Sequence, residues 1–398
     1  FVYYAHLIFF IHPIMPILLF DNAFRHQLYP FTHTRAVSAI RSGIFTPQER
    51  WERITGDKVL IQTSKSIQPL YGKPDITSNT LWIDSALVIN ASLIEQINTL
   101  QAGQCIYDTT GFIAGVGTTN DINDYASPTK LEEQQRFHYA SDLIAFNDAQ
   151  LRFDYDLLTS GKTSESIPDS CSATNKDQIF IEKNTTLLNC HLNASTGPIY
   201  IASGAEIQEG SSIRGPFVLL KDACVKMNTV VYGATTIGPK CIIGGEVKNS
   251  ILFGYSNKAH HGYLGDSVIG EWCNLGAGTT NSNVKNTAGK ISVWDESANA
   301  NRYVGNKMGV CMGDYVKTAI NTSITTGATI GVGANVFCAG LTPNFIPHFC
   351  WGIDNATYQI DKLIEDTANW KAFKNEAFSD MEKQLIRVIF ESLTSNPS

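Results

Sequence analysis

One repeat in the C-terminal half limits the possible folds more than any other feature of this chain. Eight positions spaced six residues apart, from Ile201 to Ile243, are all Ile, Leu or Val. A small residue stands two positions before most of them, with Phe217 as the exception. A period of six fits neither the 3.6 residues of a helical turn nor the two-residue alternation of a strand in a hairpin. The same spacing returns at Ile269, Leu275, Ile324, Ile330 and Val336.

This period predicts a column with three flat faces, in which each face of a coil is one short strand. One aliphatic side chain per face points inward, and stacked coils pair as parallel strands, which satisfies the backbone polar groups. A different β-solenoid is the alternative, and the period does not set the hand of the coil. The repeat stops between residues 283 and 303, a polar segment that we expect to leave the column as a loop.

A helical tail is expected after the column. Past Trp351 the apolar residues recur at helical spacing, which predicts helices that pack against the last coil. The apolar faces of these helices comprise Ile360, Leu363, Ile364, Leu385, Val388 and Ile389.

The composition excludes several classes of protein. With 43% hydrophobic and 17% charged residues, the 398-residue chain is typical of soluble globular domains. A net charge of -7 argues against a nucleic-acid partner, because phosphate binding needs a basic face. The nine cysteines form no C-x-x-C pair, so we expect reduced thiols in a cytoplasmic protein. Residues 1–14 are apolar but lack a basic segment and a cleavage site, so we interpret them as an extension and expect no membrane partner.

A dense set of polar residues and glycines lies within the repeat, between residues 248 and 283. Its order is Lys248-Asn249, His260-x-x-Tyr263-x-Gly265-Asp266, Asn274-x-Gly276-Ala277-Gly278 and Asn283. In order and spacing this segment resembles the acetyltransferase half of a bifunctional bacterial family, the N-acetylglucosamine-1-phosphate uridyltransferase / glucosamine-1-phosphate acetyltransferases. The resemblance implies a left-handed parallel β-helix that assembles as a homotrimer, with acetyl-CoA or another acyl-CoA bound in the groove between subunits.

The resemblance also implies a role for each matched residue. His260 is the general base that takes a proton from the acceptor amine, a task suited to a side chain that titrates near neutral pH. Lys248 binds the phosphate of the acceptor as a point charge. The sugar is bound by Tyr263, Asn274 and Asn283, and the acyl donor lies along Gly276, Ala277 and Gly278.

Two departures and two alternatives accompany this interpretation. Val284 stands where the family has a tyrosine, and at best Lys221 replaces a phosphate-binding arginine, so the acceptor need not be glucosamine-1-phosphate. A histidine pair at a turn, His260-His261, is also an ordinary surface feature. Some hexapeptide β-helices are zinc-dependent carbonic anhydrases, but His348 is the sole later histidine, which makes a three-histidine site the weaker alternative.

The N-terminal half alternates apolar runs with helical patterns between residues 15 and 170. Such alternation predicts an α/β layer with a mostly parallel sheet, whose sites lie at the carboxyl ends of the strands. The run "PILLFDN" is the expected first strand, so Asp21, Asn22, Arg25 and Arg35 follow its carboxyl end.

This segment resembles, at a distance, the start of sugar nucleotidyltransferases, a strand followed by a Gly-rich loop with an arginine and then a Pro-Lys. Arg25 and Pro30 keep that order and Arg35 stands near the lysine position, but the glycines are replaced. The resemblance implies that Arg25 and Arg35 hold triphosphate oxygens and that Asp84 binds Mg²⁺. The structural alternative is that both arginines form ion pairs and that Asp84 caps a helix.

The sequence therefore predicts four segments: an extension (1–14), an α/β nucleotidyltransferase-like domain (15–175), a left-handed β-helix acyltransferase domain (176–352) and a helical tail (353–398). The predicted function is acyl transfer from acyl-CoA to an amino sugar phosphate, combined with nucleotidyl transfer to a sugar-1-phosphate in sugar-nucleotide biosynthesis. The alternatives are an acyltransferase whose N-terminal domain only binds nucleotide or sugar, and a non-catalytic trimeric scaffold.

Overall fold

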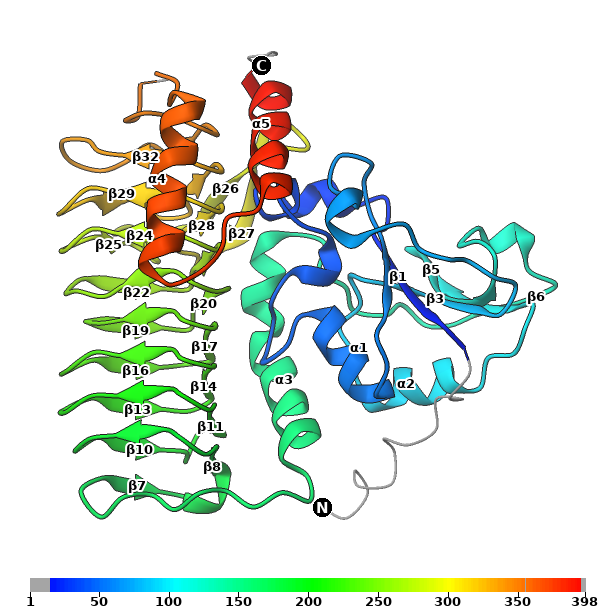
Figure 1. Cartoon of the computed structure of the whole chain (residues 1–398), viewed down its shortest axis with the longest axis horizontal. Coiled ribbons are helices and arrows are strands. Elements are labelled where there is room, and N and C mark those ends of the chain that lie inside the picture. Colours follow the sequence, from blue (N-terminus) through cyan, green and yellow to red (C-terminus); the bar gives the residue numbers. More distant parts are fainter. Residues whose placement is uncertain (1–14, 355, 395–398) are drawn as a thin grey trace.

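The computed structural model describes residues 15–354 and 356–394, so the extension predicted for residues 1–14 lies outside the described residues. An α/β domain stands beside a tall column of stacked strands, and two helices at the end of the chain lie against the upper part of that column (Figure 1). The predicted fold class is confirmed in these three parts. None of the helices in the described residues has the length and apolar character that a membrane span requires.

The N-terminal domain is built on a mixed sheet of six strands in the order β2-β1-β3-β5-β4-β6. The β1/β2, β1/β3 and β4/β6 pairs are parallel, and β5 is antiparallel to both of its neighbours. The strands are β1 (Ile17–Phe20), β2 (Leu60–Gln62), β3 (Thr80–Asp84), β4 (Gln104–Asp108), β5 (Gly111–Gly117) and β6 (Ser127–Lys130). The helices are α1 (Pro47–Thr55), α2 (Ala91–Asn98) and α3 (Ala140–Thr159).

The segment after β1 is less regular than its helical pattern suggests. It forms three single 3-10 turns, at Arg25–Leu28, Phe31–His33 and Val37–Ala39, before α1 begins. Helix α1 begins at Pro47 because Thr46 and Glu49 cap it reciprocally, each side chain accepting the backbone N–H of the other.

The column is a parallel β-solenoid with three faces. The first face carries β7 (Ser172–Thr174), β10 (His191–Asn193), β13 (Ser212–Arg214), β16 (Val230–Tyr232), β19 (Glu246–Lys248) and β22 (Tyr263–Gly265), followed by β25 (Thr280–Asn281) and β30 (Ser323–Ile324). The second face carries β8 (Ile179–Ile181), β11 (Ile199–Ile201), β14 (Phe217–Leu219), β17 (Thr235–Ile237), β20 (Ile251–Leu252), β23 (Val268–Ile269), β28 (Cys311–Met312), β31 (Thr329–Ile330) and β33 (Phe345–Ile346). The third face carries β9 (Thr186–Leu187), β12 (Glu206–Ile207), β15 (Cys224–Val225), β18 (Ile242–Ile243), β21 (Asn257–Lys258), β24 (Asn274–Leu275), β29 (Lys317–Thr318) and β32 (Asn335–Val336).

The six-residue repeat fills the interior of this column, as predicted. All eight aliphatic positions from Ile201 to Ile243 are buried and belong to one hydrophobic cluster that runs along the axis. Burial of these side chains is the main favourable contribution to the free energy of folding of the column, in which each coil contacts only its neighbours.

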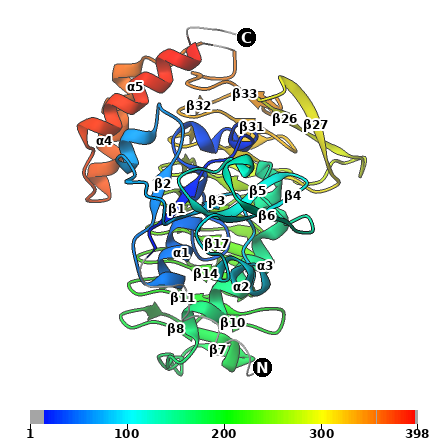
Figure 2. The ribbon, with the colours of Figure 1, turned by 90° about the vertical axis from the view of Figure 1, so that its right-hand side faces the viewer.

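The N-terminal domain docks on the second face of the column. Helix α3 runs along this face (Figures 1 and 2), and Leu151, Tyr155 and Leu158 pack against Tyr200 and Val218. Higher up, the 3-10 turns after β1 pack against the same face through a second apolar cluster, which includes Phe31, Val37, Ile40, Ile251, Phe253 and Val268. The two halves of the chain therefore share a buried interface.

The polar segment between residues 283 and 303 leaves the column as expected, but the prediction of a loop was wrong for residues 291–295 and 300–303. β26 (Ile291–Asp295) and β27 (Ala300–Gly305) form an antiparallel hairpin, in which β26 alternates between buried and half-buried positions and β27 is largely exposed. Ile291 and Val293 are buried in the cluster between the two domains. The hairpin therefore joins the column to the N-terminal domain.

The helical tail is confirmed as α4 (Ile360–Phe373) and α5 (Asp380–Thr394). Leu363 and Ile389 are buried against Val332 and Phe349 of the last coils. Val388, predicted on the buried face, is 37% exposed, and Ile386 is buried in its place.

Candidate functional site

The residues of the 248–283 motif lie on three successive coils of the column. Strands β19 and β22 place Lys248, Tyr263 and Gly265 on the first face, β24 places Asn274 on the third face, and the other residues of the motif lie at the corners. The corner between these two faces lies on the far side of the column from the docked N-terminal domain, which covers the second face.

On the first face, Lys248 and Tyr263 are brought close together by the parallel register. Lys248 pairs with Tyr232 on one side and with Gly265 on the other, and Glu246 pairs with Tyr263. A Cβ on Gly265 would come within 2.2 Å of the Tyr263 hydroxyl oxygen, so the tyrosine ring lies over this glycine. The ammonium of Lys248 lies 5.9 Å from the centre of the Tyr232 ring.

Sequence reasoning missed Tyr232 and Glu246, which complete this group. The Tyr232 hydroxyl donates to Glu246 at 2.6 Å, and this hydrogen bond raises the pKa of Tyr232 to about 12. Burial raises the pKa of Tyr263, so both phenols stay protonated at neutral pH and can donate hydrogen bonds. Glu246 lies two residues before Lys248 on the same strand and could have been found by strand alternation, whereas a shortened coil puts Tyr232 out of step with the count by sixes.

At the corner after the first face, three side chains form a polar ladder across successive coils. Asn249 donates to Asp266 at 2.6 Å, and Asn283 donates to the other carboxylate oxygen of Asp266. Asn249 and Asp266 have positive φ angles, a backbone conformation that asparagine and aspartate tolerate better than other non-glycine residues. Asn283 is thereby fixed next to Tyr263, with which it shares a hydrogen bond.

His260 lies at the opposite corner, between the third and the first face. It is exposed, and Gly262 follows it closely in the chain. Gly262 has a φ of +121°, and a Cβ on this residue would lie 2.1 Å from the Thr279 carbonyl oxygen, so the position excludes a side chain. The corner thus turns His260 outward, away from the interior of the column. An exposed imidazole at such a corner can exchange protons with a bound molecule.

Asn274 and the three residues after it lie next to this corner, one coil higher. Asn274 is on the third face and accepts a hydrogen bond from Asn257 at 3.3 Å. A Cβ on Gly276 would meet the backbone of Ala319, and one on Gly278 would meet the Asn321 side chain, so the packing of the next coil already requires both glycines. Ala277, the residue between these two glycines, is exposed.

One chain therefore gathers the predicted residues in two places. Lys248 and Tyr263 lie on the first face with Asn283 at the corner where that face ends, and His260 lies with Gly276–Gly278 at the corner where the face begins. Asn274 faces another direction. Hydrogen-bond donors, one ammonium and one exposed imidazole form a surface that can bind a polar, anionic molecule and remove a proton from it.

In the N-terminal domain, Asp84 ends β3 inside a buried network. Its carboxylate accepts hydrogen bonds from Asn22 at 3.0 Å, from the Ala86 backbone N–H at 3.0 Å and from Arg136 at 2.9 Å. Arg136 also binds Asp108 at 2.6 Å and lowers its pKa to about 2, against the effect of burial. Asp84 is 2% exposed and its oxygens are occupied, so as folded it does not fit a Mg²⁺ ligand.

The two arginines predicted to bind phosphate both have carboxylate partners. Arg25 lies 3.0 Å from Asp21, and Arg35 pairs with Asp314 and lies 3.3 Å from Glu271, both on the column. Asp21 also accepts the backbone N–H of Val37 at 2.9 Å. The Asp21 carboxylate therefore occupies N–H donors of the loop after β1. The phosphate-binding roles of both arginines stay predictions.

A group that the sequence did not bring together joins three distant segments. His33 of a 3-10 turn and His348 after β33 each lie 2.9 Å from Glu296 at the tip of the β26–β27 hairpin. Two imidazoles and one carboxylate are a possible metal-ligand set. However, the Val332 backbone N–H donates to Nδ1 of His348, which leaves the proton of the neutral ring on Nε2, the atom that faces Glu296. Metal-bound histidines show the opposite arrangement, so we interpret the group as a hydrogen-bonded clamp.

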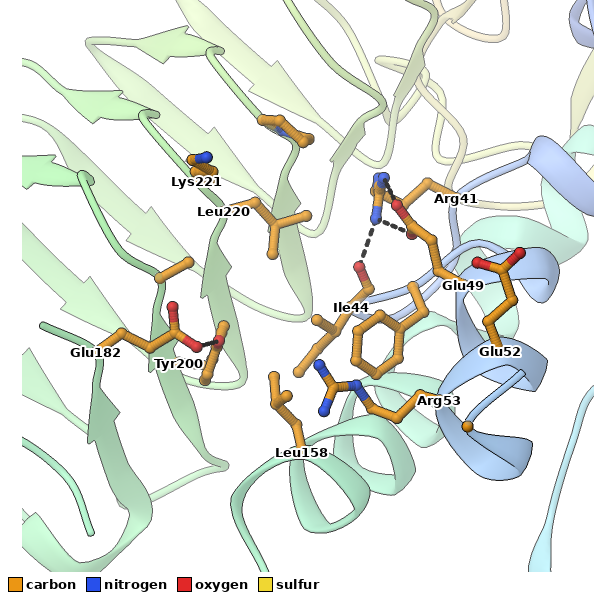
Figure 3. A pocket seen from close by; sticks show the side chains of 14 residues that line it. Arg41, Ile44, Glu49, Glu52, Arg53, Leu158, Glu182, Tyr200, Leu220 and Lys221 are labelled. Carbon is orange, nitrogen blue, oxygen red and sulfur yellow. Dashed lines mark hydrogen bonds and ion pairs between the residues drawn. The ribbon is translucent and has the colours of Figure 1, made fainter. Parts of the chain in front are cut away.

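A pocket of about 630 Å³ lies between α1, α3 and the second face (Figure 3). Its walls carry charges of both signs: Arg41 is bonded to Glu49 at 2.9 Å, the Tyr200 hydroxyl is bonded to Glu182 at 2.5 Å, and Lys221 stands at one edge. Lys221 therefore borders this cavity and not the first face on which Lys248 lies.

Residues 17–163 match a protein-family model described as sugar nucleotidyl transferase. The chain is 34% identical over 145 residues to a bifunctional sugar-1-phosphate nucleotidylyltransferase/acetyltransferase of Sulfurisphaera tokodaii, an alignment that covers 35% of each chain. It is 34% identical over 119 residues to the bifunctional protein GlmU of Methanococcus aeolicus, covering 28% of this chain and 27% of that one. It is 29% identical over 175 residues to GlmU of Synechococcus elongatus, covering 42% and 33%.

These comparisons confirm the resemblance found in the sequence. Residues 17–163 are similar to sugar nucleotidyltransferases, and about a third of the chain is similar to bifunctional nucleotidylyltransferase/acetyltransferases. The chain spans about a third of the length of the curated relatives that it matches.

Proposed function

We propose that this protein is a sugar-nucleotide pathway enzyme whose column transfers an acyl group from acyl-CoA to an amino sugar phosphate. The observation that carries the proposal is the first face, where Lys248 and Tyr263 lie between the exposed corner of His260 and the corner that holds Asn283. The relatives include proteins named acetyltransferases, which supports the same chemistry. Acetyl-CoA is the proposed donor.

In the proposed reaction, His260 accepts a proton from the acceptor amine as the nitrogen attacks the thioester carbonyl. The carbon–sulfur bond then breaks, the thiolate of coenzyme A leaves, and the proton held by His260 passes to it, so that an amide and free coenzyme A are formed. Lys248 neutralises the phosphate of the acceptor, while Tyr263 and Asn283 bind hydroxyl groups of the sugar. Asn274 and the backbone of Gly276, Ala277 and Gly278 would contact the acyl donor or the acceptor from a neighbouring subunit.

A homotrimer is part of the proposal, because the proposed residues lie on two faces of one column. Exposed apolar side chains follow the strands near the His260 corner: Met227 is 58% exposed, Val230 46% and Ile320 71%. Apolar groups in such positions favour association with a neighbouring chain. The nine cysteines are present as thiols and not as disulfides, which favours a reducing compartment such as the cytoplasm.

For the N-terminal domain we propose transfer of a nucleotidyl group to a sugar-1-phosphate, supported by the family model over residues 17–163. Arg25 and Arg35 would bind the triphosphate after exchanging their carboxylate partners for phosphate oxygens. A second candidate is favoured by the buried contacts of Asp84 and Arg136: an acyltransferase whose N-terminal domain binds nucleotide or sugar without reacting with it. Asp84 is not part of this proposal, because both of its carboxylate oxygens already accept hydrogen bonds.

The acyl-transfer proposal is tested by acetyl-CoA turnover on a panel of amino sugar phosphates. His260→Ala is expected to lower kcat by about 10²–10⁴-fold, the usual contribution of a general base. His261→Ala is a matched control, because the adjacent imidazole belongs to the same exposed corner. An equal loss in both variants, or no loss in either, would remove His260 from the mechanism and favour the scaffold alternative.

The two candidates for the N-terminal domain are separated by pyrophosphate release from UTP or dTTP with sugar-1-phosphates, measured on the full chain. Release that is lost in Arg25→Met supports nucleotidyl transfer. Nucleotide binding by calorimetry without pyrophosphate release supports the binding-only candidate.

A further inference from the structure

The third face of the column contains one charged residue in its interior. The inward position of successive coils on this face forms a row, which we call the third-face row. Lys258 occupies this row where almost every other coil has an aliphatic residue. The row comprises Leu187, Ile207, Val225, Ile243, Lys258, Leu275, Thr318 and Val336.

Lys258 is 1% exposed, so its ammonium lies inside the column. Nζ donates to two backbone carbonyl oxygens, that of Gly244 at 3.1 Å and that of His260 at 2.5 Å. No ion pair with a carboxylate accompanies this ammonium among residues 15–354 and 356–394. The side chain therefore reaches from the interior row to the corner that carries His260.

A lysine in this place makes the fold less stable at neutral pH. Burial without a counter-charge lowers the pKa of Lys258 to about 8, from its ordinary value of 10.5. The unfolded chain therefore binds the Lys258 proton more tightly than the folded chain does. At pH 7 this difference lowers the free energy of unfolding. An apolar residue, as in the neighbouring coils, would avoid this loss of stability, so stabilisation of the fold does not explain the lysine.

The corner that carries His260 explains the lysine better. Residues 259–262 leave the ladder between β21 and β22, and the regular hydrogen bonds resume only where the Glu246 N–H donates to the Gly262 carbonyl at 3.2 Å. In the corner, the carbonyl of His260 points inward to Lys258, while its side chain is exposed. The ammonium thus fixes the direction of the peptide that carries the imidazole.

We propose that Lys258 is a positioning residue for His260: its ammonium holds the His260 and Gly244 carbonyls together and thereby fixes the direction in which the imidazole leaves the column. This inference rests on the proposed function of His260. Lys258 lies in the interior and does not itself touch a substrate. It acts through the backbone, and a misplacement of a reacting group by about 1 Å can lower a rate by about a hundredfold.

The test is the variant Lys258→Met, which keeps an unbranched side chain of similar length and removes the ammonium. We expect kcat for acyl transfer to fall by about ten- to a hundredfold, while the KM values for acyl-CoA and acceptor change less than about twofold. At the same time we expect the melting temperature at pH 7 to rise, because an uncompensated buried charge is removed. The matched control is Ile243→Met in the adjacent position of the third-face row, which should change neither kcat nor KM by more than about twofold.

A loss of activity combined with a lower melting temperature would mean that Lys258 only supports the fold, and would overturn the inference. An unchanged kcat in Lys258→Met, with His260→Ala inactive, would overturn the role of Lys258 and leave the proposed function intact. Equal activities of the wild type and His260→Ala would overturn the proposed function, and the role of Lys258 with it.

Discussion

Acidification should weaken the clamp that joins the hairpin, the N-terminal domain and the last coil. Glu296 accepts hydrogen bonds from His33 and His348, and the His33 side chain is only 8% exposed. Burial is the largest cause that lowers the pKa of His33, from 6.5 to about 4. The two imidazoles lower the pKa of Glu296 in turn, so the folded protein holds a neutral His33 next to an ionised carboxylate.

The direction of the pH effect follows from the pKa of His33 in the two states. As the pH falls below 6.5 the unfolded chain takes up a proton at this histidine, whereas the folded chain takes it up only near pH 4. The stability contributed by the clamp is therefore complete above pH 6.5 and is lost as the pH falls to about 4. A pKa difference of this size corresponds to about 3 kcal/mol, of which about 2–3 kcal/mol is lost by pH 4.5. The lowered pKa of Glu296 acts in the same direction, below pH 4.5.

The assay is urea unfolding followed by tryptophan fluorescence, from pH 7.5 to pH 4.5, on the wild type and on His33→Gln. Glutamine keeps an N–H donor for Glu296 but cannot take up a proton in this range. We expect the free energy of unfolding of the wild type to fall by about 2–3 kcal/mol more than that of His33→Gln over this interval. Parallel pH profiles for the two proteins would refute the assignment of the clamp to His33.

Two further predictions concern single contacts. Arg136→Met should lower the free energy of unfolding, measured in urea, by about 3–5 kcal/mol, because two buried carboxylates lose their partner. The control Arg152→Met, at an exposed ion pair, should lower the free energy of unfolding by less than about 1 kcal/mol. Gly262→Ala should lower both the melting temperature and the rate of acyl transfer, because its Cβ would overlap the Thr279 carbonyl of the next coil, whereas Gly289→Ala, with no contact closer than 3.4 Å, should change neither.

The column could be predicted from the sequence because its stabilising contacts recur. Each coil places the same kind of side chain in the same interior position, so Ile201–Ile243 already show the three-sided cross-section. The departures from the pattern are the informative positions. Lys258 falls out of register with the count by sixes because a shorter coil precedes it, and only the strand pairing shows that it lies in the interior row.

The N-terminal domain and the candidate site could be predicted less completely, because their decisive contacts join distant segments. Arg35 was placed correctly after the first strand, but its partners Asp314 and Glu271 belong to the column, more than two hundred residues later. Asp84 was found at the end of a strand, yet nothing local shows that Arg136 binds its carboxylate. Propensity and spacing describe short segments of a chain, and charge partners across a domain interface lie beyond their reach.

The docked domain also limits how the column can meet other chains. Helix α3 and the 3-10 turns after β1 cover the second face, and the tail reaches the third face where Lys374 donates to Asn257 at 2.9 Å. The first face and the corner of His260, where Met227 and Ile320 are exposed, are left open to a neighbouring column. The fusion of the two domains thus leaves open the surface on which the proposed acyl transfer depends, and a trimer built on the second face would require the N-terminal domain to detach.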